Sequence, residues 1–171
     1  PIMVSIMDQF PEYQFVISKV AWQPLSLYQK LIGNRDIKLV EGDTYPLIHH
    51  AEAALVTSGT ATLETALLNT PQVVCYKDNA ISYSIAKRVV GKDLKYISLV
   101  NLILDQPVVT ELIQHDLNPD RLVKELKLIL KNGEKREGML EQYRELKTKL
   151  GSGGASQKGA ELIDQLVQKG N

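Results

Sequence analysis

The stretch TSGTATLETALLNTPQVVCYK, residues 57–77, decides the fold class. It closes an apolar run at 53–57, continues as the helix-forming segment ATLETALLN at 61–69, and returns to apolar residues in QVVCYK at 72–77. Strands that alternate with helices through short turns of Gly, Asn and Pro predict β-α-β crossovers and a parallel sheet. Because both apolar runs are nearly continuous, we expect the strands to be buried on both faces.

The same alternation extends to both sides of this stretch. Apolar runs predict strands at 13–18 and 37–42, and amphipathic segments predict helices at 1–9, 23–32 and 45–50. Beyond residue 80 helical segments dominate, and we predict them at 81–91, 107–116, 119–132, 134–150 and 157–169. The sequence therefore predicts an α/β fold: a Rossmann-like parallel sheet flanked by helices, with extra C-terminal helices.

The C-terminal region is predicted to separate from the rest. The stretch GSGGAS at 151–156 has the composition of a flexible linker. We therefore expect one domain at 1–150, followed by a Gly/Ser hinge and a C-terminal helix at 151–171. At the other end, PIMVSIMDQFPEYQF begins with neither a capping residue nor an initiating Met, which predicts that the chain is a piece of a longer protein.

Composition narrows the classes of partner. Lys plus Arg and Asp plus Glu each number 20, so there is no overall basic field, and no nucleic-acid partner is expected. The only cysteine, Cys75, cannot form a disulfide or a CxxC motif within the chain, which favours a cytoplasmic setting. It lies in an apolar run and is interpreted as a small core residue. His49 and His50 point about 100° apart on a helix, so they cannot share a metal. We expect neither a metal nor a cofactor.

The residues that follow the run at 53–57 suggest a ligand site. Ser58, Gly59 and Thr60 stand where a parallel strand ends and a helix begins, which is the position of free amide groups and of the positive end of the helix dipole. Gly59 has no Cβ and lets a ligand approach the backbone, while the two hydroxyls add hydrogen-bond donors. We interpret this segment as a cradle for phosphate.

Glu64 adds a second chemical function. It lies four residues after Thr60, one helical turn further on the same side. A carboxylate there can accept two hydrogen bonds from the cis-diol of a ribose, so that phosphate donors and a ribose acceptor together suggest a nucleotide. The plainer alternative is that Ser-Gly-Thr only caps the helix and that Glu64 favours its dipole.

An ordered series of motifs resembles the lipid-A-disaccharide synthase family. The matching segments, in chain order, are Ser58-Gly59-Thr60-Ala61, Glu64, Tyr76-Lys77, Ala86-Lys87-Arg88, Ser98-Leu99-Val100-Asn101 and Glu111-Leu112-Ile113-Gln114. The resemblance covers nearly the whole chain and implies the C-terminal, donor-binding half of a two-domain GT-B glycosyltransferase. The family usually has proline where Val100 stands. Its Gly-Ser-Arg loop and its N-terminal domain, with the acidic catalytic residues, are expected upstream of residue 1.

The resemblance also implies the reaction. A family member is an inverting hexosyltransferase that moves a diacylglucosaminyl group from UDP-2,3-diacylglucosamine to 2,3-diacylglucosamine 1-phosphate in lipid A biosynthesis. By resemblance, the site residues are Ser58, Gly59 and Thr60 for the diphosphate, Glu64 for the ribose, Asn101 as a catalytic residue on the donor side, and Gln114 as a further substrate-binding residue. For Asn101 a cap or turn role is the alternative. Because the family's base belongs to the N-terminal domain, the fragment alone is expected to be inactive.

Partners follow from the same resemblance. We expect the donor, the N-terminal domain of the same protein, and peripheral contact between basic residues at 77–95 and the inner face of the inner membrane. The final helix is expected either to pack on that domain or to be exchanged in a homodimer. Two alternatives remain open: another UDP-sugar GT-B protein, such as a MurG-like transferase or a UDP-GlcNAc epimerase, and a nucleotide-free flavodoxin-like interaction domain. The SLVN and ELIQ stretches favour the named family over the other enzymes.

Overall fold

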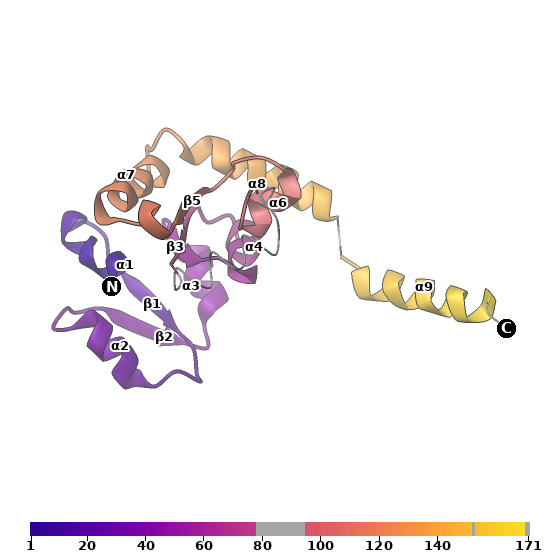
Figure 1. Ribbon diagram of the computed structural model, residues 1–171, viewed down its shortest axis with the longest axis horizontal. Coiled ribbons are helices and arrows are strands. Elements are labelled where there is room, and N and C mark those ends of the chain that lie inside the picture. The colour runs from indigo at the N-terminus through magenta and orange to yellow at the C-terminus, as the bar shows by residue number, and fades with distance from the viewer. Residues whose placement is uncertain (78–94, 152, 170–171) are drawn as a thin grey trace.

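Strands and helices alternate along the first half of the chain (Figure 1). The computed structural model describes residues 1–77, 95–151 and 153–169. The described strands are β1 (Val16–Lys19), β2 (Lys38–Glu41), β3 (Ala54–Thr57), β4 (Gln72–Tyr76) and β5 (Thr110–Ile113). The described helices are α1 (Ile2–Ser5), α2 (Leu25–Ile32), α3 (Thr44–His50), α4 (Thr60–Leu67), α6 (Leu99–Leu104), α7 (Pro119–Ile129), α8 (Arg136–Leu150) and α9 (Ala155–Lys169), with short 3-10 helices at Met7–Gln9 and Gln114–Asp116. The helix predicted at 81–91 lies outside the described residues.

All described strand pairs are parallel, which confirms the predicted α/β class. Strands β3, β4 and β5 form one sheet in that order, with Thr57 opposite Cys75 and Cys75 opposite Leu112. Strands β1 and β2 form a second, two-stranded sheet in which Val16 lies opposite Lys38. Helices flank both sheets in Figure 1. The strands predicted from the apolar runs therefore divide between two sheets in the described structure.

The hydrophobic core surrounds β4, the central strand of the three-stranded sheet. Residues Gln72–Cys75 are all buried, and α7 and α8 add apolar side chains such as Leu122 and Leu146 that have no exposed surface. Burying a side chain of this size contributes about 1.5–3 kcal/mol. One polar link crosses this core: the amide of Gln72 donates to the Thr62 carbonyl at 2.8 Å and to the Tyr143 hydroxyl at 3.3 Å. It joins β4 to α4 and α8.

The helix predicted at 107–116 is wrong. Thr110–Ile113 form strand β5, which pairs with β4, and only Gln114–Asp116 continue as a 3-10 helix. Val109 and Leu112 are buried in the core. Pairing with β4 provides the backbone N–H and C=O groups with the hydrogen bonds that they would otherwise form within a helix. Helix α6 was not predicted at all. It begins after Ser98, whose hydroxyl accepts a hydrogen bond from the backbone N–H of Asn101 at 3.3 Å.

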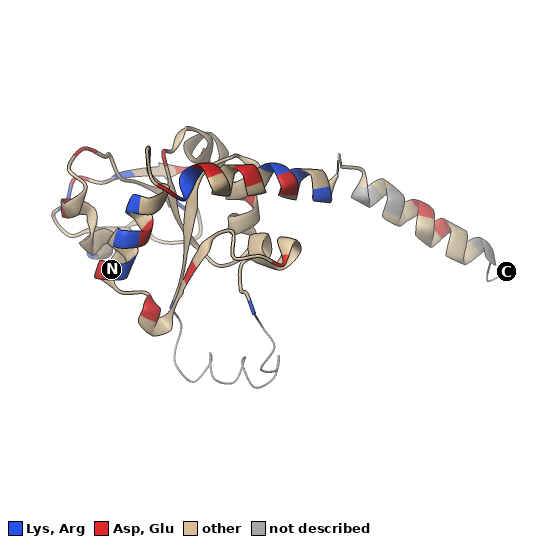
Figure 2. Cartoon of the chain, turned by 90° about the horizontal axis from the view of Figure 1, so that it is seen from above, with Lys and Arg blue, Asp and Glu red and all other residues tan. Residues whose placement is uncertain are grey.

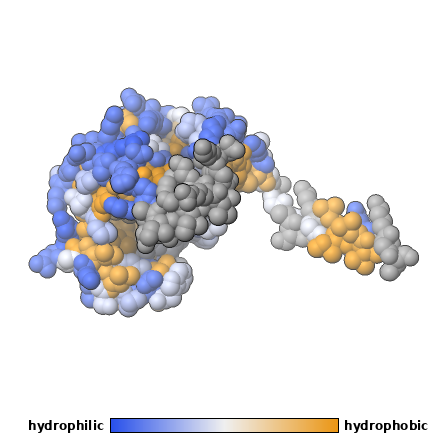
Figure 3. Space-filling model, in the orientation of Figure 1, coloured by the Kyte–Doolittle hydropathy of each residue, from blue (hydrophilic) through white to orange (hydrophobic). Residues whose placement is uncertain are grey.

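The C-terminal helices differ in their contacts. Figure 2 shows basic and acidic residues interleaved along α8, as predicted for a solvated helix face, while its residues Met139, Tyr143 and Leu146 are buried. Helix α9 projects away from the rest of the described chain (Figure 1), beyond glycines with positive φ at Gly151, Gly153 and Gly154. Its apolar side chains Leu162, Ile163, Leu166 and Val167 are each more than half exposed, and they form the hydrophobic patch on α9 in Figure 3. The division at residue 150 stays a prediction.

Crossing a bilayer requires a long apolar helix. None of the helices in the described ranges has both the length and the apolar character for this.

Cys75 is expected to be inert in the native protein. The residue is 2% exposed, and burial raises the pKa of its thiol to about 12, so that the reactive thiolate is scarce at neutral pH. A thiol reagent at pH 7.5 should therefore label the chain only as it unfolds, with labelling complete in urea. Because the chain has a single cysteine, mass spectrometry of the intact protein gives the result directly. Labelling of the folded protein at the rate of a free cysteine would contradict the buried placement.

Candidate functional site

The carboxyl ends of β3, β4 and β5 meet at one edge of the larger sheet. Because the strands are parallel, the residues that follow them, Ser58, Lys77 and Gln114, all emerge at this edge. Ligands of open α/β sheets bind beyond this edge, where the helices that follow the strands present their N-termini. The edge therefore holds most of the residues that the sequence singled out.

Ser58, Gly59 and Thr60 form the SGT loop, which leads from β3 into α4. Gly59 precedes the first residue of α4 and has φ 144° and ψ −164°. Among the described residues, no side chain caps α4, and a Cβ placed on Gly59 would meet none of their atoms within 4 Å. Gly59 and Thr60 are both exposed. With respect to the residues that the structure describes, the entrance to α4 is therefore open, and the helix dipole and the amides at its start favour an anion there.

The side chain of Ser58 links the SGT loop to the segment before α6. Its hydroxyl donates a hydrogen bond to the carbonyl of Ile97 at 3.0 Å, across 39 residues of sequence. A hydroxyl has one proton to donate, so in this arrangement the Ser58 side chain offers a phosphate no free donor. The SGT loop can then bind an anion through its backbone amides and through Thr60. The assignment of the Ser58 side chain to the diphosphate stays a prediction.

Glu64 lies one turn into α4, on the same face as Thr60. The residue is half-buried, and its carboxylate forms no hydrogen bond or ion pair with any residue in the described ranges. A carboxylate in this state keeps its full capacity to accept hydrogen bonds from a ligand. This availability is what the predicted contact with a ribose requires.

Gln114 lies directly after β5 and carries two signs of strain. Its φ is 53°, in the left-handed region that non-glycine residues rarely adopt, and this costs about 1–3 kcal/mol. Its side-chain nitrogen is buried and finds no hydrogen-bond partner among the described residues. Leaving such a donor unpaired costs about 1–3 kcal/mol as well. Strain of this kind gathers at ligand sites, so the geometry supports the prediction that Gln114 binds substrate.

Asn101 is 1% exposed, and both the nitrogen and the oxygen of its side-chain amide form hydrogen bonds. Its nitrogen donates to the Val109 carbonyl and to the Glu111 carboxylate, both at 2.9 Å, and its oxygen accepts from the Val109 amide at 2.9 Å. These contacts are those of a residue that joins α6 to β5. The catalytic role assigned to Asn101 stays a prediction, and direct contact with a sugar would require some of these bonds to break.

The structure brings two of the predicted motifs into one network. The Glu111 carboxylate accepts hydrogen bonds from the backbone amides of Ile97 and Ser98, from the Ser98 hydroxyl and from Asn101. Ser98 and Asn101 belong to SLVN and Glu111 to ELIQ, and Ser58 reaches the same network through Ile97. From the sequence alone, Glu111 has no role beyond its place in a motif, because nothing in its local pattern indicates a partner 10 to 14 residues away.

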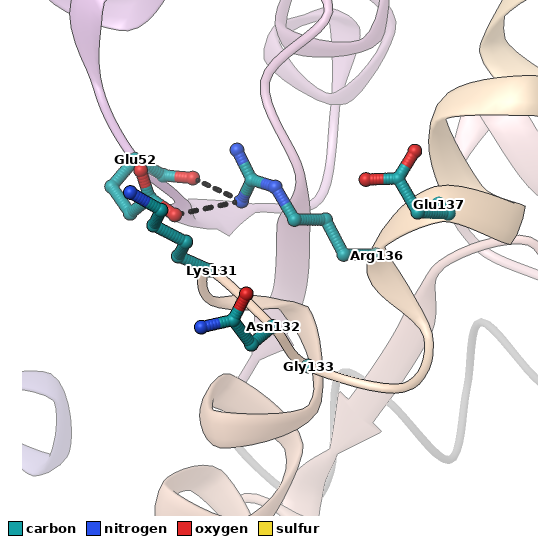
Figure 4. Close-up of a pocket in the computed structure, with 6 residues that line it drawn as sticks. All are labelled: Glu52, Lys131, Asn132, Gly133, Arg136 and Glu137. Atoms are coloured by element: carbon teal, nitrogen blue, oxygen red, sulfur yellow. Dashed lines mark hydrogen bonds and ion pairs between the residues drawn. The ribbon is translucent and has the colours of Figure 1, made fainter.

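A hollow at the opposite edge of the sheet is structural. Figure 4 shows its lining residues, which are Glu52, Lys131, Asn132, Gly133, Arg136 and Glu137. The guanidinium of Arg136 donates to the carbonyls of Glu52 and Ile129 at 2.9 Å and pairs with the Glu52 carboxylate at 3.1 Å. Glu52 precedes β3, so this hollow lies at the amino ends of the strands, away from the SGT loop. It contains none of the predicted site residues.

Comparison with known proteins adds an independent observation. A family model described as lipid-A-disaccharide synthetase matches residues 2–166. The chain is 41% identical over 133 residues to the lipid-A-disaccharide synthase of Syntrophus aciditrophicus, covering 78% of this chain and 34% of that protein. It is 33% identical over 172 residues to the enzyme of Solibacter usitatus, covering 98% and 45%, and 32% identical over 174 residues to that of Haemophilus influenzae, covering 97% and 44%.

The chain thus spans less than half of the length of these curated relatives. The match nevertheless runs through both sheets, the SGT loop, helices α1 to α4 and helices α6 to α8. From this match and these identities, the chain belongs to the lipid-A-disaccharide synthase family.

Proposed function

We propose that the chain is the donor-binding part of a lipid-A-disaccharide synthase and that it holds UDP-2,3-diacylglucosamine at the carboxyl edge of its three-stranded sheet. The observation that carries the proposal is that the SGT loop and, one turn later, the Glu64 carboxylate are left free by all the described residues, in a chain of this family. The family match also favours this function over another UDP-sugar enzyme and over a nucleotide-free interaction domain.

In the proposed complex, each feature of the edge has a chemical task. The diphosphate lies against the SGT loop, where the uncapped amides and the dipole of α4 offset its charge. Glu64 accepts hydrogen bonds from the ribose, and the Gln114 side-chain nitrogen, which has no partner in the described part of the chain, donates to the donor sugar or its phosphates. The donor would thus supply hydrogen-bond partners to the amides at the start of α4, to the Glu64 carboxylate and to the Gln114 side chain.

In the proposed reaction, the donor-binding part stabilises the leaving group. A hydroxyl of 2,3-diacylglucosamine 1-phosphate attacks the anomeric carbon and inverts it, while the bond to the β-phosphate oxygen breaks and UDP departs. Negative charge then grows on that oxygen, where dipoles already aligned on the SGT loop are most effective. A general base must take the proton of the attacking hydroxyl. We assign that base to a part of the longer family proteins outside the match, and so expect this chain alone to bind UDP without transferring sugar.

The proposed partners are the remainder of the protein and a membrane that supplies the acylated substrates. Of the basic residues at 77–95, Lys77 is exposed at the carboxyl edge and Lys95 pairs with Asp105 at 3.2 Å; Lys87, Arg88 and Lys92 lie outside the described residues. An exposed lysine near an anionic surface contributes about 1 kcal/mol to binding. We propose peripheral contact at the inner face of the inner membrane, within the cytoplasm.

A UDP titration followed by thermal denaturation tests the proposal. Binding to the native state at a hundred times Kd stabilises it by about 2.7 kcal/mol, which for a chain of this size raises Tm by about 5–10 °C. Uridine and inorganic pyrophosphate, which each make part of the contacts, should raise it less at equal concentration. ADP, which differs from UDP in its nucleobase, serves as the control for recognition of the uracil. A Tm that UDP at millimolar concentration does not change would contradict the proposed function.

A further inference from the structure

We propose that Glu111 is a positioning residue for the donor site, which holds the SGT loop in place through the backbone of Ile97. This inference rests on the proposed function, since it assigns to Glu111 an effect on the binding of the diphosphate. Glu111 does not belong to the open edge itself. It lies within β5, where its backbone pairs with Val74 of the buried central strand β4. The backbone that carries the Glu111 carboxylate is therefore held in place by the core.

The two oxygens of the Glu111 carboxylate have separate tasks. Oε1 accepts from the Ser98 amide at 2.9 Å, the Ser98 hydroxyl at 2.7 Å and the Asn101 side chain at 2.9 Å, which fixes the start of α6. Oε2 accepts from the Ile97 amide at 2.9 Å. Because α6 is already capped by Ser98, the bond to Ile97 is not needed for that helix to begin. The hydrogen bond from the Ile97 amide to Oε2 must therefore act on another part of the chain.

Ile97 transmits the position of the carboxylate to the SGT loop. Its amide is held by Glu111, and its carbonyl accepts the Ser58 hydroxyl at 3.0 Å. Both polar backbone groups of Ile97 are thus used, one toward the core and one toward the loop. Ser58 is followed directly by Gly59, whose φ of 144° is set at the entrance to α4. A chain of two hydrogen bonds therefore connects a strand of the core to the residues that would meet the diphosphate.

Replacing Glu111 with glutamine tests this link selectively. Glutamine keeps one acceptor oxygen, which three donors at Ser98 and Asn101 compete to hold, and it turns an NH₂ group toward the Ile97 amide. Two donors then face each other and the link to Ile97 is lost. We expect the Kd for UDP to rise about tenfold, which corresponds to about 1.4 kcal/mol, while the Kd for uridine, which has no phosphate, stays unchanged.

Ser58→Ala removes the other end of the same link. It should weaken UDP binding about as much as Glu111→Gln does. The double variant should lose no more affinity for UDP than either single variant, because both substitutions break the same chain of hydrogen bonds. Ser58→Thr keeps the hydroxyl and should restore UDP binding. The matched control is Glu125→Gln: Glu125 is a buried carboxylate of α7 that accepts hydrogen bonds from Thr110 of β5 at 2.9 Å and from Lys135 at 2.8 Å. It should lower Tm without changing either Kd.

Calorimetry on folded samples, checked by circular dichroism, separates the outcomes. If the wild-type chain does not bind UDP, the proposed function fails and the inference fails with it. If the wild type binds and folded Glu111→Gln binds equally well, or if its loss adds to that of Ser58→Ala, the positioning role alone is wrong. Should Glu111→Gln not fold, Ser58→Ala and Ser58→Thr decide: a loss with alanine that threonine restores supports the link, and equal binding by both overturns it.

Discussion

Replacing Gly59 with valine is expected to lower the affinity for UDP at least about a hundredfold, or about 2.7 kcal/mol. Gly59 has φ 144° and ψ −164°, a combination that is essentially restricted to glycine. The site offers room for a side chain, since a Cβ there meets no atom of the described residues within 4 Å, but this room is the space in front of the amides of α4. Valine would both strain the loop and occupy the place of the diphosphate.

The matched control for this change is Gly138→Val. Gly138 is exposed within α8, and a Cβ there also meets nothing within 4 Å, so the same side chain is added without strain at a positive φ and far from the SGT loop. It should leave the Kd for UDP unchanged. Calorimetric titration measures both variants, and Tm shows that Gly59→Val remains folded, with a cost of about 1–3 kcal/mol for the strained residue. Wild-type affinity in folded Gly59→Val would place the diphosphate away from the SGT loop.

Much of the fold could be predicted because local patterns and tertiary structure agree. Strands β3 and β4 and helices α4, α7 and α8 lie within a few residues of their predicted positions, since each has its own apolar pattern and turn residues. The helix predicted at 107–116 fails because PVVTELIQ spaces its apolar residues equally well for a helix, and only pairing with β4 makes Thr110–Ile113 a strand. The pairing of strands across two sheets has no local signal either.

The candidate site was predictable to the extent that it depends on one segment. The placement of the SGT loop at the start of α4, and of Glu64 one turn into that helix, follows from the order of residues after β3. The bond from Ser58 to Ile97 and the engagement of Asn101 with Val109 and Glu111 do not, because they join residues that are brought together only by the fold. For the same reason, Glu111 had a place in a motif but no function until its four donors were known.

Replacing Glu64 with alanine is expected to weaken UDP binding about thirtyfold and to erase the preference for ribose over deoxyribose. Hydrogen bonds to a charged group contribute about 1.5–3 kcal/mol, and the half-buried carboxylate of Glu64 has no described partner that competes with the ligand. The wild type should therefore bind UDP more tightly than 2′-deoxy-UDP. The variant should bind both equally, while the Kd for pyrophosphate stays unchanged, because the SGT loop is intact.

Stability separates this binding role from the plainer role of a helix residue. A carboxylate that is half-buried without a partner does not stabilise the free chain, so Glu64→Ala should change the free energy of unfolding by less than about 0.5 kcal/mol. Glu145→Ala, on the exposed face of α8, is the control for the loss of one negative charge and should change neither stability nor affinity. Urea unfolding and titrations with the three ligands give the answer. If Glu64→Ala weakened UDP, 2′-deoxy-UDP and pyrophosphate equally and lowered stability as well, Glu64 would support the helix alone, and the recognition of ribose would have to come from another residue.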